Sequence, residues 1–167
     1  MLTGPMDYTP GGFGNSSREE FAARDVRPMV QGTRAHQLAM YAVYQSPFQM
    51  VSDSPEAYKD QPAFEFIRAA PANWDETRVL NGMPGEFITV ARRRGTEWFL
   101  GAMTDWTARE LDLPLSFLGA GKYRAEIYQD SGAAKNVAIT KAEVDRSGHL
   151  TAKMAAGGGY AVRFVKM

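Results

Sequence analysis

The sequence predicts a mixed α and β fold in which an α/β portion is followed by an antiparallel β-sandwich. The principal observation is that the hydrophobic period changes near Pro71. Before this point, apolar segments of strand length alternate with segments of helical periodicity, which is typical of parallel strands joined by helical crossovers. Beyond it, apolar residues recur at every second position in short segments separated by turn signals, which is typical of antiparallel strands.

The first portion is expected to begin with a strand, a long loop and a helix. Residues 1–6 form the apolar strand segment, and the Gly-, Ser- and charge-rich stretch that follows is of the kind found in functional or flexible loops. Residues 33–46 then carry apolar side chains at helical spacing, with Thr33 placed to cap the start and Pro47 to end the helix.

A second strand and further helix are expected to complete the first portion. The strand covers 48–51 and ends shortly before Asp53, and helix follows in 54–58 and 60–70. In α/β folds, functional side chains gather at the carboxyl ends of the strands. Asp7 and Asp53 are therefore expected to share one rim.

The second portion is expected to be an antiparallel sandwich of roughly seven or eight strands. A hairpin is predicted where two period-two segments flank the turn "RGTE", and further segments follow between Gly- and Asp-containing turns. Three consecutive glycines, Gly157–Gly159, lie between two strand patterns and are interpreted as a turn. The predicted strands cover residues 86–93, 97–104, 110–115, 122–130, 137–144, 149–154 and 160–166.

The composition limits the classes of function. The chain carries 19 Lys and Arg against 19 Asp and Glu, so the formal net charge is zero and no long-range field attracts nucleic acid or an anionic membrane. The lack of cysteine excludes disulfides, thiolate zinc sites and a cysteine nucleophile. The two histidines are far apart in sequence, and no apolar stretch approaches the length that spans a bilayer. We therefore expect no nucleic acid or membrane partner and no metal site in this chain.

The first portion poses an architectural problem. A parallel sheet of two strands cannot bury both of its faces, because such sheets need several strands with helices on each side. Two solutions are open. Either the first portion packs on the second in an unusual way, or the chain is the tail of a longer protein in which further units complete a barrel.

Five blocks of the sequence carry a resemblance to a known family: "MLTGPMDYTPGGF", "GTRAHQLAMYAVYQSPFQMVSDSPEAY", "ANWDETRVLNG", "VARRRGTEWFLGAMTDW" and "LDLPLSFLGAGKYRAEIYQD". Together they resemble the C-terminal end of glycoside hydrolase family 97, a family of α-glucosidases and α-galactosidases. The resemblance implies that residues 1–72 are the last two (β/α) units of a (β/α)8 catalytic barrel. It also implies that residues 73–167 are a C-terminal antiparallel β-sandwich that serves oligomerisation, and that Met1 corresponds to an internal position of the longer enzyme.

The resemblance further implies what this chain lacks. Glycoside hydrolysis needs two carboxyl groups flanking the scissile bond, and in this family those groups and the calcium-binding glutamates lie upstream of the block "GPMDYTPG". The chain is expected to brace the barrel of an exo-acting α-glucosidase or α-galactosidase and to form homo-oligomers, without catalytic residues of its own. Calcium, a carbohydrate substrate and a periplasmic or secreted location are implied for the full-length enzyme only.

Asp7, Tyr8 and Asp53 are the candidate substrate-binding residues at the rim of the barrel. Carboxylates accept hydrogen bonds from sugar hydroxyls, and an aromatic ring such as that of Tyr8 stacks on a sugar face. Each aspartate also has a structural interpretation. Asp7 would cap a turn before Pro10, and Asp53, in the sequence "SDSP", would cap the following helix, which is the interpretation favoured for Asp53.

Other polar residues of the chain are given structural roles. Asp75 and Glu76 are adjacent, so on a strand they would face opposite sides, and they are expected to make turn and interdomain hydrogen bonds. His36 is expected to be a structural histidine. The run Arg92–Arg94 is interpreted as a solvated hairpin rather than a phosphate clamp.

Two functions compete with that of an enzyme fragment. In the first, the chain is a stand-alone carbohydrate-binding module, in which Trp74, Trp98 and Trp106 form an aromatic platform for sugar rings. Trp98 alternates with Phe99 in a predicted strand, however, and is expected in the core or at a domain interface. In the second, the chain is a purely structural oligomerisation module.

Overall fold

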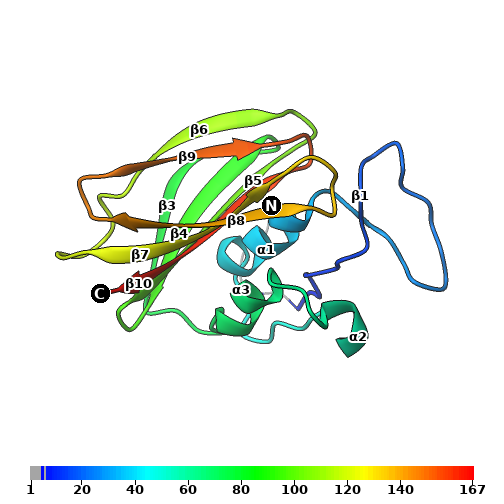
Figure 1. Cartoon of the computed structure of the whole chain (residues 1–167), viewed down its shortest axis with the longest axis horizontal. Helices are drawn as coiled ribbons and strands as arrows, with labels where there is room; N and C mark the ends of the chain where they lie inside the picture. The colour runs from blue at the N-terminus through cyan, green and yellow to red at the C-terminus, as the bar shows by residue number, and fades with distance from the viewer. Residues whose placement is uncertain (1–4, 6) are drawn as a thin grey trace.

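Two stacked sheets and a layer of helices make up the molecule (Figure 1). The computed structural model describes Pro5 and residues 7–167, so the predicted strand at 1–6 lies outside the described residues except for Pro5. Strands β6 and β9 form a small sheet that lies above the large sheet in Figure 1, and the helices lie below it. The observed fold is thus mixed α and β with an antiparallel sandwich, as expected.

The large sheet has six strands in the order β3-β4-β5-β10-β7-β8, and every neighbouring pair is antiparallel. The second sheet pairs β6 with β9, also antiparallel. The strands are β3 (Glu76–Met83), β4 (Phe87–Arg94), β5 (Glu97–Thr104), β6 (Arg109–Pro114), β7 (Tyr123–Asp130), β8 (Val137–Val144), β9 (His149–Met154) and β10 (Gly159–Lys166).

All seven strands predicted for the second portion are present as β4 to β10, with ends that differ by at most one residue. The eighth, β3, was not predicted. It is the edge strand of the large sheet, and its pairing with β4 is irregular between Val79 and Asn81. An edge strand that buries little of its surface has no need of a strict apolar alternation, so its sequence carries a weak strand signal.

The longest helix, α1 (Arg34–Val43), begins as predicted. The hydroxyl oxygen of Thr33 accepts a hydrogen bond from the backbone amide of His36 at 3.1 Å, which satisfies one free amide of the first turn. Two short helices follow, α2 (Pro55–Tyr58) and α3 (Phe64–Ala69). None of the helices in the described part of the chain has the length and hydropathy needed to cross a bilayer.

The expected strand at 48–51 is reduced to one parallel bridge between Tyr8 and Gln49. The long loop after Tyr8 contains a parallel pair of two-residue strands that was not predicted, β1 (Asn15–Ser16) and β2 (Val30–Gln31). This pair closes the base of the loop, whose outer part projects away from the rest of the molecule (Figure 1).

Two hydrophobic cores lie on opposite faces of the large sheet. The period-two pattern of β5 divides its side chains between them, with Trp98 and Leu100 facing β6 and β9, and Phe99 and Met103 facing the helices. The helix-side core combines α1 and α3 with β4, β5, β7 and β10. Residues before and after Pro71 therefore share one core.

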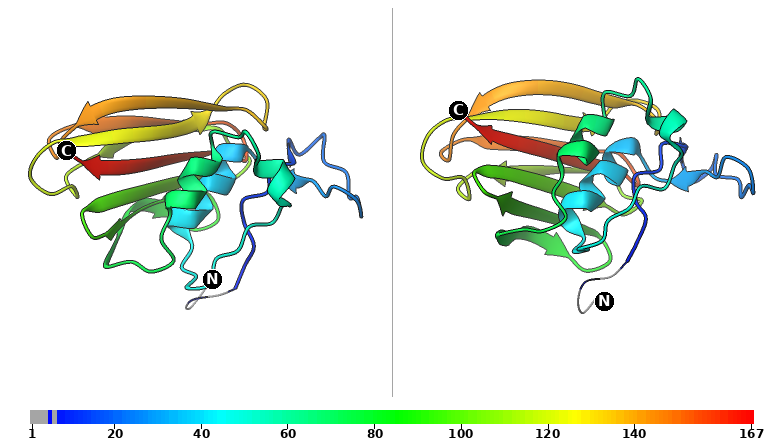
Figure 2. Two further views of the ribbon diagram at one scale, coloured as in Figure 1. Left: turned by 60° about the horizontal axis from the view of Figure 1, so that its bottom comes forward. Right: turned by 90° about the horizontal axis from the view of Figure 1, so that it is seen from below.

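Helix α1 crosses the strands of the large sheet and touches its backbone closely (Figure 2). Gly101 of β5 lies directly beneath it, since a Cβ atom there would lie 2.5 Å from the carbonyl oxygen of Ala39. Gly159, at the start of β10, lies beneath the backbone of His36 in the same way. The glycine run Gly157–Gly159 is thus more than the turn that was predicted, because the lack of a side chain at Gly159 lets the backbone of α1 pack directly on β10.

The substitution Gly101→Ala tests this close approach. The added methyl group would overlap the Ala39 carbonyl and would approach Val43 Cγ2 to 3.0 Å, so α1 must move away from the sheet. We expect a loss of about 2 kcal/mol or more in the free energy of unfolding, measured by urea denaturation. Gly119→Ala is the matched control, because the new methyl would meet no backbone atom and only the hydroxyl at the far end of the Tyr123 side chain, at 3.1 Å. Equal stability of the two variants would contradict the close approach.

Candidate functional site

Two segments far apart in sequence lie side by side along α1, and we call them the rim segments (residues 8–13 and 49–53). The parallel bridge joins Tyr8 and Gln49, and the backbone amide of Ser52 donates to the carbonyl oxygen of Pro10 at 3.1 Å. Further along, the carboxylate of Asp53 accepts a hydrogen bond from the backbone amide of Phe13 at 2.5 Å. The rim segments therefore run in parallel over several residues.

Asp53 does not cap the helix that follows it, so the capping interpretation is wrong. The residue at the N-cap of α2 is Ser54, which makes no side-chain capping bond, and Pro55 occupies the first turn. A proline at that position needs no amide acceptor, which lowers the demand for a cap. The Asp53 carboxylate instead reaches Phe13, a residue 40 positions earlier in the chain.

Tyr8 and Asp7 differ in exposure. The Tyr8 hydroxyl donates to the carbonyl oxygen of Met40 at 2.8 Å, and its ring meets Tyr44 edge to face with 5.0 Å between ring centroids. Burial raises the pKa of Tyr8, so the hydroxyl keeps its proton. Asp7 is exposed to solvent. Tyr8 and Asp53 therefore lie at opposite ends of the paired rim segments, and Asp7 is on the surface next to Tyr8, so the structure does not bring Asp7 and Asp53 together as expected.

Four side chains that the sequence analysis missed hold the first rim segment. The amide oxygen of Gln37 accepts from the backbone amide of Gly11 at 3.0 Å. The hydroxyl of Tyr58 donates to the Gly11 carbonyl at 3.0 Å, and that of Tyr41 lies 3.2 Å from the Pro10 carbonyl. The signal for Gln37 was a polar residue on the apolar face of a predicted helix; the tyrosines gave no such signal.

Arg34 is the fourth of these residues, and it closes the base of the long loop. Its guanidinium donates to the carbonyl oxygen of Phe13 at 2.8 Å and to the side-chain oxygens of Gln61 and Asn15 at 2.8 and 3.2 Å. It also lies over the Phe13 ring, 4.3 Å from the centroid, which adds a cation–π contact. Burial lowers the pKa of Arg34, and the nearby Asp53 carboxylate opposes that shift.

The side chains of His36 and Asp130 both bind backbone groups at or just before the start of β10. His36 Nδ1 lies 2.9 Å from the Gly158 carbonyl oxygen, so this nitrogen carries the proton and donates. The Asp130 carboxylate accepts from the backbone amides of Ala155 and Gly159 at 2.9 and 3.1 Å. Burial lowers the pKa of His36 and raises that of Asp130. The structural role expected for His36 is confirmed by this bond.

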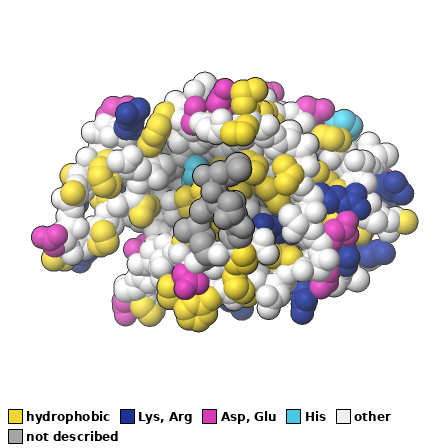
Figure 3. Space-filling view, turned by 180° about the vertical axis from the view of Figure 1, so that it is seen from behind, with side chains coloured by type: hydrophobic (Ala, Val, Ile, Leu, Met, Phe, Trp, Pro, Cys, Tyr) yellow, Lys and Arg dark blue, Asp and Glu magenta, His cyan; other side chains and the backbone are white. Residues whose placement is uncertain are grey.

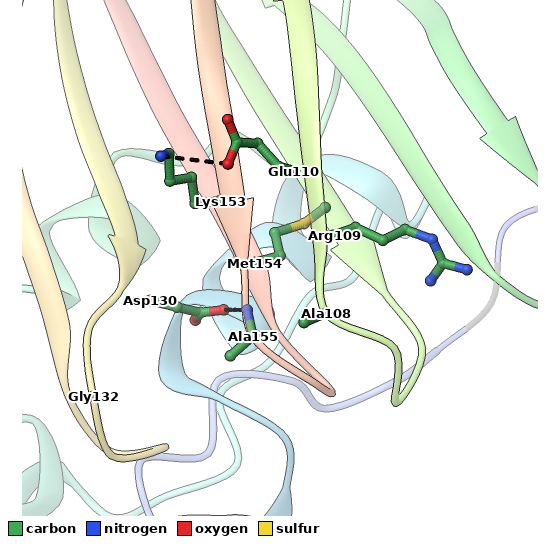
Figure 4. Close-up of a pocket in the computed structure, with 8 residues that line it drawn as sticks. All are labelled: Ala108, Arg109, Glu110, Asp130, Gly132, Lys153, Met154 and Ala155. Atoms are coloured by element: carbon green, nitrogen blue, oxygen red, sulfur yellow. Dashed lines mark hydrogen bonds and ion pairs between the residues drawn. The ribbon is translucent and has the colours of Figure 1, made fainter.

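A small pocket of about 440 Å³ lies next to Asp130, between the end of β7 and the strands β6 and β9 (Figure 4). Most of its polar side chains already have partners, although Asp130 Oδ1 has none among the described residues. Asp130 points to the amide of Ala155, and Lys153 pairs with Glu110 at 3.3 Å on the outer face (Figure 4). The pocket therefore offers few unpaired groups to a ligand.

The solvated hairpin expected for the run Arg92–Arg94 is confirmed for Arg94, which is exposed, and is wrong for Arg92. Arg92 is only 5% exposed, and its guanidinium donates to the carbonyl oxygens of Val43 and Tyr44 at 3.0 and 3.3 Å. These are the last carbonyls of α1, where a positive charge is favourable. An arginine on a strand of the second portion thus caps a helix of the first.

Asp75 and Glu76 hold the β-strands together. The Asp75 carboxylate accepts from the amide of Gly95 at 2.7 Å, which is the first cause of its lowered pKa, and it also pairs with Arg94. Glu76 pairs with Arg78 and Arg93. The hydrogen bond that Asp75 was expected to make to a turn is confirmed. The hydrogen bonds expected between the two portions of the chain are wrong, because the partners of Asp75 and Glu76 all lie within residues 73–167.

The three tryptophans do not share one face, so they form no platform. Trp98 is 3% exposed and packs between the two sheets, as expected for a core residue. Trp74 packs on Phe99 on the helix side of the large sheet. Trp106, 36% exposed, covers Gly157. This arrangement does not favour a stand-alone carbohydrate-binding module.

Charges of both signs lie on the face of the molecule that Figure 3 shows. In the view from behind, acidic and basic side chains are mixed, with the basic ones most frequent at the right-hand end, and hydrophobic side chains are spread across the centre (Figure 3). Among the residues that the structure describes, no group of three or more His, Cys, Asp or Glu side chains is arranged to hold a metal ion.

Comparison with known proteins identifies the family. Residues 73–165 match the family model described as "Glycosyl-hydrolase 97 C-terminal, oligomerisation". The chain is 40% identical to a retaining α-galactosidase of Bacteroides thetaiotaomicron over 98% of its own length and 25% of that protein. It is 34% identical to a probable retaining α-galactosidase of Streptomyces bingchenggensis, with 96% of this chain and 23% of that protein covered.

A solved structure agrees with these matches. A family 97 enzyme variant from Pseudoalteromonas sp. strain K8, in complex with panose, superimposes with a TM-score of 0.86 at 38% identity, over 98% of this chain and 27% of that one. The matches place the chain among the glycoside hydrolases. More narrowly, it belongs to glycoside hydrolase family 97 and carries the C-terminal oligomerisation domain of that family. The chain spans about a quarter of the length of these relatives.

The substitution Tyr58→Phe tests the network that holds the rim segments. Removal of the hydroxyl leaves the Gly11 carbonyl without its donor and the Asp53 amide, at 2.9 Å, without its acceptor. Because both groups are buried or partly buried, we expect a loss of about 1–3 kcal/mol in the free energy of unfolding. Tyr44→Phe is the control, since Tyr44 touches Tyr8 but lies outside this network. A loss equal to that of the control would contradict the role of Tyr58.

The substitution His36→Asn tests the contact of α1 with the start of β10. Burial lowers the pKa of His36 from its ordinary 6.5, so the unfolded chain binds more protons as the pH falls through that value. The wild-type protein should therefore lose stability between pH 7 and 5. Asparagine keeps a donor for Gly158 and does not titrate, so the variant should lose less, as measured by urea denaturation at each pH. Identical pH profiles would contradict this prediction.

Proposed function

We propose that residues 1–72 form the end of a (β/α)8 catalytic barrel and that residues 73–167 form the C-terminal antiparallel β-sandwich that serves oligomerisation. The observation that carries this proposal is the parallel course of the rim segments, which α1 connects as a crossover helix. In a (β/α)8 barrel, successive strands are parallel neighbours joined in this way, with the helix on the outside.

Exposed apolar side chains on the second rim segment and just before it support the barrel. Phe48, Met50 and Val51 are 63%, 41% and 40% exposed. Three large apolar side chains within four residues are unusual on a free surface and are typical of one that another part of a protein covers. Further barrel strands, supplied by residues that precede this chain in the full-length protein, would cover them.

We propose that the full-length protein is an exo-acting α-galactosidase or α-glucosidase. The two curated relatives carry the name α-galactosidase, and the solved family 97 relative was captured with panose, so both substrate classes are retained. The catalytic carboxyl groups would come from the preceding residues. This chain would brace the barrel through the helix-side core and provide the surface for homo-oligomer formation.

Asp7, Tyr8 and Asp53 remain our candidates for contact with the sugar. Asp53 lies at the carboxyl end of the second rim segment, where barrel enzymes bind their substrates, whereas Asp7 and Tyr8 lie at the amino-terminal end of the first one. A carboxylate has about four sites for accepting hydrogen bonds, so Asp53 can bind both the Phe13 amide and a sugar hydroxyl. Its bond to Phe13 additionally fixes the rim segments relative to each other.

We propose that calcium binds to the full-length protein at residues outside this chain. The described residues hold no cluster of carboxylates that fits a calcium ion, which takes six to eight oxygen ligands. We therefore assign no residue of this chain to calcium and derive no step of the reaction from it.

The proposed function is tested by comparing the 167-residue chain with the full-length protein on aryl α-galactosides and aryl α-glucosides. We expect no turnover by the chain alone and turnover of one or both substrates by the full-length protein. Within the full-length protein, Asp7→Asn should raise KM, because a neutral amide binds sugar hydroxyls more weakly than a carboxylate does. Turnover by the isolated chain, or an inactive full-length protein, would overturn the proposal.

A further inference from the structure

A groove of about 1020 Å³ follows the flank of α1 on the helix side of the large sheet. One wall is α1, from His36 to Val43 and Tyr44 just beyond its end. The other wall and the floor come from the β3–β4 hairpin and the end of β5. Two exposed apolar side chains line the hairpin wall: Val79, 66% exposed, and Met83, 51% exposed.

The groove continues the row of helices that lie over β5. Three residues of β5 face the helices in succession. Phe99 packs against Phe66 of α3, Gly101 lies beneath α1, and Met103 lines the groove. Along the strand, the order is therefore α3, α1 and then the groove, so the groove lies on the flank of α1 that faces away from α3.

The dimensions of the groove fit a helix. Residues that face the same side of a strand are about 7 Å apart, and packed helices lie about 8–10 Å apart. The place next to α1 is thus one helix spacing away from its axis. From His36 to Tyr44, the groove follows α1 for about 12 Å, which is slightly more than two helical turns.

The order of the helices identifies the occupant. In a (β/α)8 barrel, successive helices are neighbours on the outside and run in the same direction. If α1 and α3 are the helices of the last two units, the helix of the preceding unit lies beside α1 on the side away from α3. We propose that the groove holds this preceding barrel helix, which belongs to the residues before this chain in the full-length protein. This inference rests on the barrel proposed above.

The charges at the two ends of the groove agree with a helix parallel to α1. Glu86 and Asp105 line the end next to the start of α1, and Arg92 lines the end where α1 finishes. Arg109 pairs with both acids, which leaves a net charge of −1 on the three side chains. A helix parallel to α1 places its positive N-terminal end at the acids and its negative C-terminal end at Arg92, and both placements are favourable.

The experiment uses a single cysteine in a chain that has none of its own. Val79→Cys places a thiol in the groove, and Ile139→Cys, on strand β8 at the opposite edge of the sheet and 38% exposed, is the control. Each variant is prepared as the 167-residue chain and in the active full-length protein. The rate of maleimide labelling is followed by mass spectrometry of the tryptic peptide that carries the cysteine. Met83→Cys is a second position in the same groove.

We expect Val79→Cys to be labelled in the isolated chain at a rate independent of protein concentration, and at least about tenfold more slowly in the full-length protein. The control should be labelled equally in both. Rapid labelling of Val79→Cys and Met83→Cys in an active full-length protein would overturn this inference and leave the proposed function intact. Protection that appears in the isolated chain as its concentration rises would assign the groove to a second copy and would also overturn it. A full-length protein without glycosidase activity would instead overturn the proposed function.

Discussion

The contact between the backbone of α1 and the backbone of the large sheet is the constraint on which the rest of the structure depends. Gly101 and Gly159 allow it, since any side chain at either position would overlap the helix. The helix is thereby held against β5 and β10, and its buried face completes the second hydrophobic core. Arg92 then caps the far end of α1 from strand β4, which fixes the helix along its axis. A small shift of α1 would disturb all three contacts at once.

The rim segments inherit their position from α1. Gln37, Tyr41 and Arg34 project from this helix to the backbone of residues 10–13, and Tyr58 and Asp53 approach the same backbone from the other side. Backbone groups in a buried loop must find partners, and here side chains supply them. Because the large sheet holds α1, it also fixes the position of the rim segments that the side chains of α1 bind.

The strands of the second portion could be predicted because a hydrophobic core covers each face of the large sheet, so successive side chains of a strand enter opposite cores. Trp98, Leu100, Phe99 and Met103 alternate between two cores, so the period-two pattern is regular and the ends of the strand coincide with the turns. Edge strand β3 escaped prediction because it faces partly open surface at Val79 and Met83. The strand expected at 48–51 remains a single bridge, because the described residues supply only one neighbour for it.

The sequence by itself determined the local elements: the helix after Thr33, seven of the eight strands of the second portion, and, through blocks of resemblance, the family. Its periodicity and capping residues act within a few positions, so such patterns can be recognised from the sequence alone. Only the tertiary structure decided what polar residues do. Arg92, Asp53 and Tyr58 bind backbone groups about 40 or more residues away. Such partners are set by how α1 lies on the sheet, and no local pattern encodes that placement.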